Sequence, residues 1–211
     1  MEQRSNEWFE ARRGKVTASR ITTGLLMGKT TVGYTNLFAE ALVVRMGGVA
    51  GEGYVNGNLS ADVKRGIALE PEARAHYQFV QDVDVIEPGF ILHPTLPHCG
   101  ASPDGLVGDE GLIEIKCRRT AEHINFIIKR DIPKAYRYQM QFQMMCTGRE
   151  WCDYVSYDPR LAPYNLQFDF ERIYPDDAII EEITAAVHEF NADVDAKIEQ
   201  LNKLSKERNQ W

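Results

Sequence analysis

The chain has 211 residues, of which 44% are hydrophobic and 26% charged, and its formal net charge at pH 7 is −7. This length and apolar content suffice for one sizeable core, so we expect a single domain over residues 1–211. The negative charge argues against a protein that coats nucleic acid non-specifically, although an acidic exterior can enclose a basic groove. The sequence has no apolar run of about 18 residues and a polar start, so we expect a cytoplasmic protein without membrane contact.

Helical patterns dominate the first part of the chain. Ser5 can cap a first short helix that Gly14 ends, and Pro71 lies inside a long fourth helix. The glycine-rich stretch 47–58 separates the third and fourth helices and is expected to be mobile. The four helices are predicted over 6–13, 17–27, 35–46 and 60–81.

The rest of the chain alternates strand and helix patterns. Strands are predicted over 83–92, 100–107, 112–117, 151–157 and 165–173, the first of them with a turn at Pro88-Gly89. Helices are predicted over 120–129 and 134–147, and a C-terminal helix over about 176–207. The last helix repeats apolar residues every three or four positions, which favours packing against the domain over a subunit contact. We therefore expect an α/β fold with a mixed β-sheet core flanked by helices.

Two acids and a lysine converge on the hairpin predicted over 100–117. Glu114 and Lys116 share one face of their strand because side chains alternate, and folding at the turn brings Asp104 beside them. Carboxylates suit Mg²⁺, and a neighbouring lysine can orient or deprotonate an attacking water. This is the PD-(D/E)xK pattern of metal-dependent nucleases with a restriction-endonuclease-like fold. An ordinary hairpin with a cross-strand ion pair would carry the same residues.

Further polar residues can add to such a site. Glu70, in the middle of the long helix, can supply a carboxylate for a second metal ion, or can simply face solvent. Gln139 and Gln143 lie one helical turn apart, either toward the sheet or on the helix surface. The four scattered cysteines favour buried thiols over a metal site.

Three residues are candidates for anchoring a phosphate group, namely Arg12, Ser19 and Ser102. Ser19 lies near a predicted helix start, where free backbone N–H groups favour anions. Helix capping alone would explain Ser19 equally well.

The order of these motifs resembles that of the lambda exonuclease family, also called YqaJ-like viral recombinases. The resemblance covers about residues 5–173 and rests on several motifs rather than on the acids and lysine alone. In chain order they are Trp8-x-x-x-Arg12, Gly14-x-x-Thr17-Ala18-Ser19, Gly66-x-x-x-Glu70, Ser102-Pro103-Asp104-Gly105, Glu114-Ile115-Lys116-Cys117, Tyr136-x-x-Gln139-x-Gln141 and Tyr157-Asp158-Pro159-Arg160.

The resemblance implies a toroidal homotrimer that threads double-stranded DNA. It implies processive 5′→3′ digestion of one strand from a 5′-phosphorylated end, with release of 5′-mononucleotides. Two Mg²⁺ ions would serve each active site, and Mn²⁺ could substitute. The remaining 3′ single strand would pass to a phage single-strand annealing protein, which makes this a phage or prophage protein in a bacterial cytoplasm.

The resemblance also assigns roles to individual residues. Asp104, Glu114 and the carbonyl of Ile115 would hold metal, with Glu70 at the second ion or its waters. Lys116 would position and activate the water, and Gln139 would help to place the attacking group. Arg12, Ser19 and Ser102 would bind the 5′-phosphate. Val63 falls at the position of a strand-separating wedge, and Lys29 lies in a loop expected to touch DNA.

Two other functions stay open at this point. A structure-specific or restriction-type endonuclease would share the metal site but would cut circular DNA. A non-catalytic DNA-end-binding scaffold would bind DNA without a Mg²⁺-dependent product.

Overall fold

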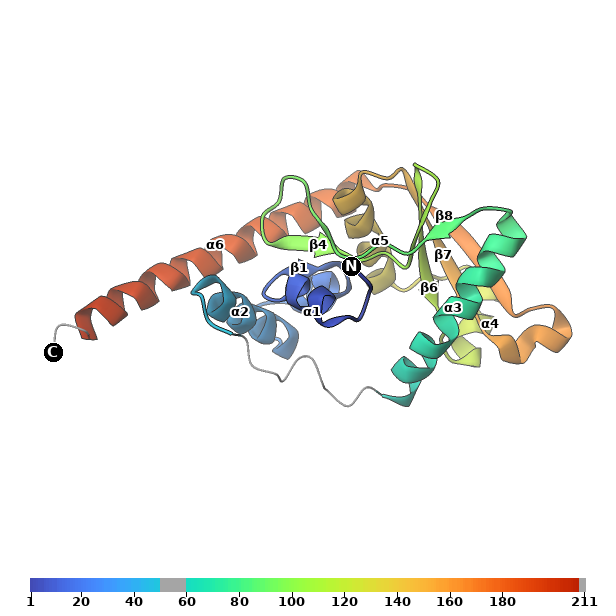
Figure 1. Cartoon of the computed structure of the whole chain (residues 1–211), viewed down its shortest axis with the longest axis horizontal. Coiled ribbons are helices and arrows are strands. Elements are labelled where there is room, and N and C mark those ends of the chain that lie inside the picture. The colour runs from blue at the N-terminus through green and yellow to red at the C-terminus, as the bar shows by residue number, and fades with distance from the viewer. Residues whose placement is uncertain (50–59, 209–211) are drawn as a thin grey trace.

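A five-stranded mixed β-sheet forms one half of the molecule (Figure 1). The computed structural model describes residues 1–49 and 60–208. In the order β2-β5-β6-β7-β8, β6 and β7 run parallel and the other neighbours run antiparallel. The strands are β2 (Val85–Ile86), β5 (Gly105–Val107), β6 (Gly111–Lys116), β7 (Trp151–Tyr157) and β8 (Phe168–Ile173). The expected α/β class and mixed sheet are confirmed.

A second, three-stranded sheet lies beside the N-terminal helices. Its order is β1-β4-β3, with β1 parallel and β3 antiparallel to β4. The strands are β1 (Val16–Thr17), β3 (Ile91–Leu92) and β4 (Cys99–Ala101). The segment 83–92 is interrupted at the predicted Pro88-Gly89 turn, but its two parts belong to different sheets, because the chain leaves one sheet at β2 and enters the other at β3.

The strand predicted over 100–107 is divided in the same way. It consists of β4 in the small sheet and β5 in the large sheet, and residues 102–104 cross between them. Pro103 has no N–H to donate to a strand ladder, which suits the crossing point. The hairpin of β5 and β6 remains as expected, with Gly105 opposite Ile113.

Helices cover both faces of the large sheet and pack around the small one. They are α1 (Asn6–Arg12), α2 (Val32–Arg45), α3 (Ala61–Gln81), α4 (Thr120–Lys129), α5 (Lys134–Thr147) and α6 (Asp177–Arg208). Shorter helical turns are η1 (Ala18–Arg20), η2 (Ile21–Leu26) and η4 (Pro159–Tyr164). The predicted bounds of α4 and α5 are confirmed, and α6 agrees with the predicted C-terminal helix to one residue at each end.

Two helix predictions need correction. The segment 17–27 is no single α-helix, because it contains the end of β1, a 3₁₀ turn and a π-helical turn. α2 begins three residues before the predicted start, where the Thr31 hydroxyl accepts a hydrogen bond from the Tyr34 amide at 3.2 Å. Most of the stretch 47–58, predicted to be mobile, lies outside the described residues.

The central strand β6 is buried on both faces. On one face, Ile113 packs with Tyr77 of α3. On the other face, Leu112 packs with Phe126 of α4 and Met140 of α5. Because side chains alternate along a strand, Glu114 lies on the Leu112 face and is directed toward α5. The packing of β6 therefore places the carboxylate of Glu114 in the interior of the protein.

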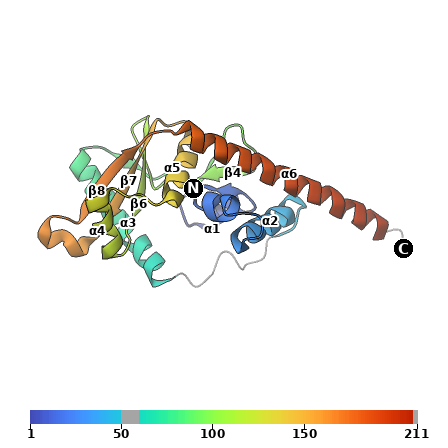
Figure 2. The same ribbon diagram turned by 180° about the vertical axis from the view of Figure 1, so that it is seen from behind.

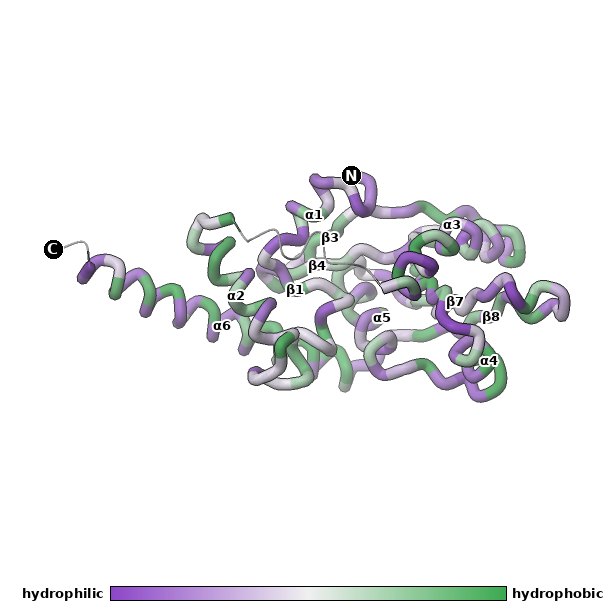
Figure 3. The backbone as a smooth tube through the Cα atoms, turned by 90° about the horizontal axis from the view of Figure 1, so that it is seen from below, coloured by the Kyte–Doolittle hydropathy of each residue, from purple (hydrophilic) through white to green (hydrophobic). Residues whose placement is uncertain are grey.

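The long helix α6 packs along α2 and α5 and then continues past α2, away from the sheets (Figures 1 and 2). Its buried positions end at Val194, and the side chains of residues 199–208 are exposed. Figure 3 shows hydrophilic and hydrophobic residues alternating along its length. Across the described ranges, every helix is too short or too polar to cross a membrane.

Candidate active site

Asp104 is placed by the crossing from β4 to β5. Its carboxylate accepts a hydrogen bond from the backbone N–H of Ile115 at 2.7 Å. The hairpin therefore closes with Asp104 beside the strand that carries Glu114 and Lys116, as the sequence predicts.

Glu114 is 1% exposed, and both of its oxygens have donors. Gln139 of α5 donates to Oε1 at 2.7 Å, and Gln143, one turn later, donates to Oε2 at 2.6 Å. Lys116 forms an ion pair with the same Oε1. A buried carboxylate needs such partners, since an isolated charge is costly away from water. The two glutamines therefore face the sheet, and they fix the carboxylate plane.

Lys116 is held as an ammonium ion. Burial works against its charge, but the carboxylates of Glu114 and Asp104 raise the pKa of Lys116 above its ordinary value. Its Nζ lies 4.6 Å from the ring centroid of Tyr136, which adds a cation–π contact. A protonated lysine in this position can orient water or stabilise phosphate charge.

Glu70 is 8% exposed, so the solvent-facing alternative for this residue is wrong. Arg74, one helical turn later, donates to its Oε1 at 2.9 Å, and Arg4 donates to its Oε2 at 2.6 Å. Arg74 also donates to the backbone carbonyl of Asp104 at 3.0 Å. Arg74 therefore links Glu70 on α3 to the crossing segment that carries Asp104.

The donor chemistry of this centre fits a hard divalent cation. Burial, together with the negative charges of Glu114 and Glu70, raises the pKa of Asp104 well above its ordinary value. Carboxylate oxygens and the carbonyl of Ile115 are oxygen donors of the kind that Mg²⁺ takes. Within residues 1–49 and 60–208, the acids, histidines and cysteines form no ready-made cluster of three, so a cation would displace some of the present hydrogen bonds.

The catalytic candidates lie between two depressions in the surface. A small hollow of about 150 Å³ is lined by Gln3, Arg4, Trp8, Arg12, Ala18, Ser19, Ser102, Asp104 and Gln139. A large cleft of about 530 Å³ is lined by Asp62, Val63, Gly66, Ile67, Glu70, Ile115, Lys116, Cys117, Arg118, Arg119, Glu122 and Tyr136. Asp104 and Gln139 face the small hollow, whereas Glu70 and Lys116 face the large cleft.

The small hollow brings the three predicted phosphate ligands together. The Ser102 hydroxyl accepts hydrogen bonds from Arg12 at 3.1 Å and from the Trp8 indole at 2.9 Å. The Arg12 guanidinium lies 4.0 Å from the Trp8 ring centroid. Ser19 lines the same hollow, but η1 is only three residues long, so the helix-terminus argument for Ser19 is wrong.

Arg12 is half-buried, and no carboxylate of the described residues forms an ion pair with it, although the charge of Glu40 acts on it from a greater distance. Burial, with the nearby charge of Arg20, lowers the pKa of Arg12 to about 10, which leaves it cationic at neutral pH. Among the residues that the structure describes, no acid lies within ion-pair distance of it. A fixed guanidinium beside hydroxyl groups is suited to an anion, and especially to a phosphate.

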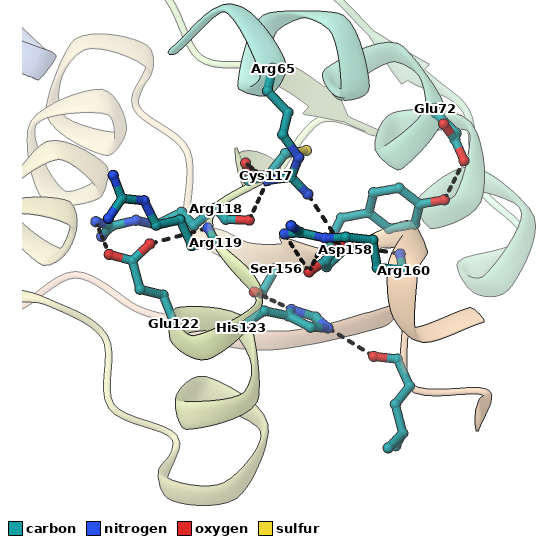
Figure 4. Close-up of polar contacts among 12 residues, drawn as sticks. Arg65, Glu72, Cys117, Arg118, Arg119, Glu122, His123, Ser156, Asp158 and Arg160 are labelled. Carbon is teal, nitrogen blue, oxygen red and sulfur yellow. Dashed lines mark hydrogen bonds and ion pairs between the residues drawn. The ribbon is translucent and has the colours of Figure 1, made fainter. Parts of the chain in front are cut away.

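The arginines around the large cleft are instead paired with acids (Figure 4). Arg65 of α3 donates to the carbonyl of Arg118 at 2.6 Å and to the fully buried Asp158 at 3.1 Å. Burial opposes the charge of Asp158, but hydrogen bonds from Arg160 lower its pKa to about 2. This network ties α3 to the chain just after Lys116 and so fixes the width of the cleft.

The two predicted DNA contacts have different positions. Val63, in the first turn of α3, is 46% exposed and lines the large cleft. Lys29 lines neither depression. It forms exposed ion pairs with Asp193 and with Glu189 of α6, the latter at 2.8 Å. A DNA contact for either residue stays a prediction.

Sequence reasoning did not assign a site role to Arg4 or Arg74, whereas it did name Gln143 together with Gln139. Arg74 carries a local signal, because it lies four residues, about one helical turn, after the candidate Glu70. Arg4 carries no local signal, because its contact with Glu70 spans 66 residues.

Comparison with known proteins gives a consistent result. The model of the YqaJ-like viral recombinase domain matches residues 7–150. An alkaline exonuclease from Laribacter hongkongensis, LHK-Exo, is 45% identical, with a TM-score of 0.83 over 96% of this chain and 99% of that chain, and it is also known in complex with dAMP. A phage-related exonuclease from Haemophilus somnus 129PT, 17% identical, has the same fold, with a TM-score of 0.66 over 89% of this chain and 96% of that one. No match is found among curated proteins.

Proposed function

Because this chain belongs to the YqaJ-like viral recombinase family, the lambda exonuclease family, we propose that it is a Mg²⁺-dependent 5′→3′ exonuclease of double-stranded DNA. The proposed reaction hydrolyses one strand of a linear duplex processively from a 5′-phosphorylated end. It releases 5′-mononucleotides and leaves a 3′ single strand for annealing recombination. The observation that carries the proposal is the half-buried Arg12, which has no ion pair with an acid in the described part of the chain and lies in the same hollow as Asp104 and Gln139.

The sizes of the two depressions support action at an end. The small hollow, of about 150 Å³, is well below the roughly 300–1,000 Å³ of pockets that enclose whole drug-sized ligands, so it suits a phosphate group. The large cleft, of about 530 Å³, has room for the adjoining part of the strand. A phosphate held by Arg12 and Ser102 would place the next phosphodiester near Asp104 and Lys116. That LHK-Exo has been seen with dAMP, a nucleoside monophosphate, agrees with this arrangement.

The residues of the site divide the work of hydrolysis. Asp104, Glu114 and the carbonyl of Ile115 would hold one Mg²⁺ and Glu70 a second, with Mn²⁺ as a substitute. Bound there, the metal would polarise the scissile phosphate and lower the pKa of a bound water. Lys116 would orient the attacking water and stabilise negative charge on the phosphate. Gln139 and Gln143 keep Glu114 in one orientation.

The wider context is proposed from family membership. The chain would form a toroidal homotrimer around DNA, in the cytoplasm of a bacterial host, and would pass the 3′ strand to a phage single-strand annealing protein. A ring converts repeated encounters into one binding event and thereby supports processive digestion.

The test is digestion of a linear duplex labelled separately at its 5′ and 3′ ends, with and without Mg²⁺. A closed-circular duplex serves as the control. The proposal expects Mg²⁺-dependent loss of the 5′-phosphorylated strand as mononucleotides, while 3′ strands and circles stay intact. Nicked circles would establish an endonuclease, and binding without any product would establish a scaffold.

A further inference from the structure

The first five residues form an N-terminal strap over the small hollow. The Gln3 side-chain amide donates to the carbonyl of Pro88 at 2.9 Å and to that of Pro103 at 2.8 Å. Gly89 leaves room for the Met1 backbone, because a Cβ there would lie 2.7 Å from the Met1 carbonyl oxygen. The strap is therefore seated on the segment that leads directly into Asp104.

The strap holds Arg4 in an unusual conformation. Arg4 has φ +66°, in the left-handed region that non-glycine residues rarely adopt. The turn is closed by a hydrogen bond from the Ser5 amide to the Glu2 carbonyl at 3.3 Å, and Ser5 then caps α1. A strained residue between two anchored neighbours is a fixed element, so the location of its side chain is set by the fold.

The Arg4 guanidinium reaches both Glu70 and the small hollow. It donates to Glu70 Oε2 at 2.6 Å, and its side chain is 40% exposed. It lines the small hollow together with Arg12 and Ser102. Glu70 would not be left alone if Arg4 moved, because Arg74 donates to the other oxygen at 2.9 Å.

We propose that Arg4 is a second phosphate-binding residue, which exchanges Glu70 for the terminal 5′-phosphate of DNA and thereby frees Glu70 Oε2 for a cation. This inference rests on the proposed function. A terminal phosphate monoester carries about −1.5 to −2 charges at pH 7, more than the single Arg12 can balance. A planar guanidinium suits carboxylate and phosphate equally well, so the exchange replaces one charge-assisted contact by another.

The alternative is that the Arg4–Glu70 pair only fastens the strap to α3. A fastening role predicts that loss of Arg4 changes stability, or weakens every DNA end alike. A phosphate-binding role predicts a change confined to 5′-phosphorylated ends, and a free enzyme that binds metal more tightly once Arg4 is gone.

The first measurement uses the full chain in EDTA, where no strand is cleaved. Affinities for a short duplex with 5′-phosphate and for the same duplex with 5′-hydroxyl ends are measured by fluorescence anisotropy. For Arg4→Ala, we expect affinity for the phosphorylated duplex to fall about tenfold and affinity for the hydroxyl duplex to stay within about threefold. Arg4→Lys, which keeps the charge, should fall between, and Lys197→Ala on α6 should match the parent chain.

The second measurement titrates Mn²⁺ into the free protein and follows unbound Mn²⁺ by electron paramagnetic resonance. We expect Arg4→Ala to bind Mn²⁺ more tightly than the parent chain. An equal loss at both kinds of end, no loss at either, or unchanged Mn²⁺ affinity would overturn the inference. A parent chain that does not distinguish the two ends would instead refute the end recognition in the proposed function.

Discussion

The two depressions that meet at the catalytic centre are both lined with arginines, but these arginines differ in whether they are paired with acids. Around the large cleft, Arg118 pairs with Glu122 and Arg119 with Asp62. In the small hollow, Arg4 pairs with Glu70, but the contacts of the Arg12 guanidinium with described residues are to a hydroxyl group and aromatic rings. The comparison teaches that the number of arginines does not locate an anion site. What matters is whether an arginine has no ion pair with a described acid, as for Arg12, or can exchange its acid for a phosphate, as we propose for Arg4.

The largest expected effect is on the rate of hydrolysis by Lys116→Ala, with little change in affinity for DNA. In Lys116→Ala the water and the phosphate lose the ammonium beside Glu114, so we expect the rate of strand digestion to fall by about 10³-fold. Affinity for 5′-phosphorylated duplex in EDTA should stay within about threefold, because Arg12 is intact. Digestion timed by gel, with anisotropy in parallel, checks both statements. A variant that binds poorly but digests at the parent rate would contradict this division.

The next largest effect concerns Arg12, which has no ion pair with an acid in the described part of the chain. Arg12→Ala removes the charge from the small hollow, and we expect affinity for 5′-phosphorylated duplex to fall about 10–100-fold. Affinity for the 5′-hydroxyl duplex should change far less, since that end lacks the group that Arg12 would bind. Equal losses on both duplexes would show that Arg12 acts on DNA in general. Thermal unfolding of the variant verifies that the hollow keeps its fold.

A third prediction concerns stability at the large cleft. The pKa of Asp158 falls from 3.8 to about 2 on folding, which corresponds to about 2 kcal/mol of unfolding free energy. Because the pKa is lowered, this stabilisation is complete above pH 3.8 and disappears as the pH falls toward 2. We expect Asp158→Asn to lose about 2 kcal/mol at pH 7 by urea denaturation, and progressively less below pH 4.

The control for that measurement is Glu10→Gln, at an exposed ion pair with Arg13. It should leave the unfolding free energy unchanged, because surface ion pairs contribute little. A loss for Asp158→Asn that is the same at pH 7 and at pH 2.5 would mean that packing, and not charge, is responsible.

The smallest expected effect concerns Arg119, an acid-paired arginine of the large cleft. Arg119 lies at the rim of the large cleft with its charge already shared with Asp62 at 2.5 Å. We expect Arg119→Ala to change affinity for either duplex by less than about threefold. A loss as large as that of Arg12→Ala would mean that Arg119 binds DNA at the large cleft in spite of its ion pair with Asp62.

Much of the fold could be predicted because its signals are local. α4 has strong apolar periodicity, and Gly148, with φ +68°, ends α5. The meeting of Asp104 with Glu114 and Lys116 followed from a turn and a period of two. These features depend on neighbours in sequence, so one chain sufficed to find them.

The predictions are wrong where contacts between residues far apart in the sequence determine the local structure. Val16 and Ile21 are fully buried in the core beside the small sheet, and this packing replaces the helix predicted over 17–27 by a strand and two short turns. The change from one sheet to the other at residues 102–104 depends on long-range strand pairing, so the local sequence pattern does not reveal it. The contact of Arg4 with Glu70 is equally invisible in the sequence, since it joins the strap to a different helix.

The crossing at residues 102–104 also sets the spacing between Ser102 in the small hollow and Asp104 in the catalytic centre. Ser102 accepts the hydrogen bond from Arg12, and Asp104, two residues later, receives the amide of Ile115. On the proposed function, the place where a strand is gripped and the place where it is cut are set by this one short segment. On the same proposal, this backbone segment would set the length of each product, and every turnover would advance the DNA by the same step. Lengthening the segment by one residue would disturb grip and cut together.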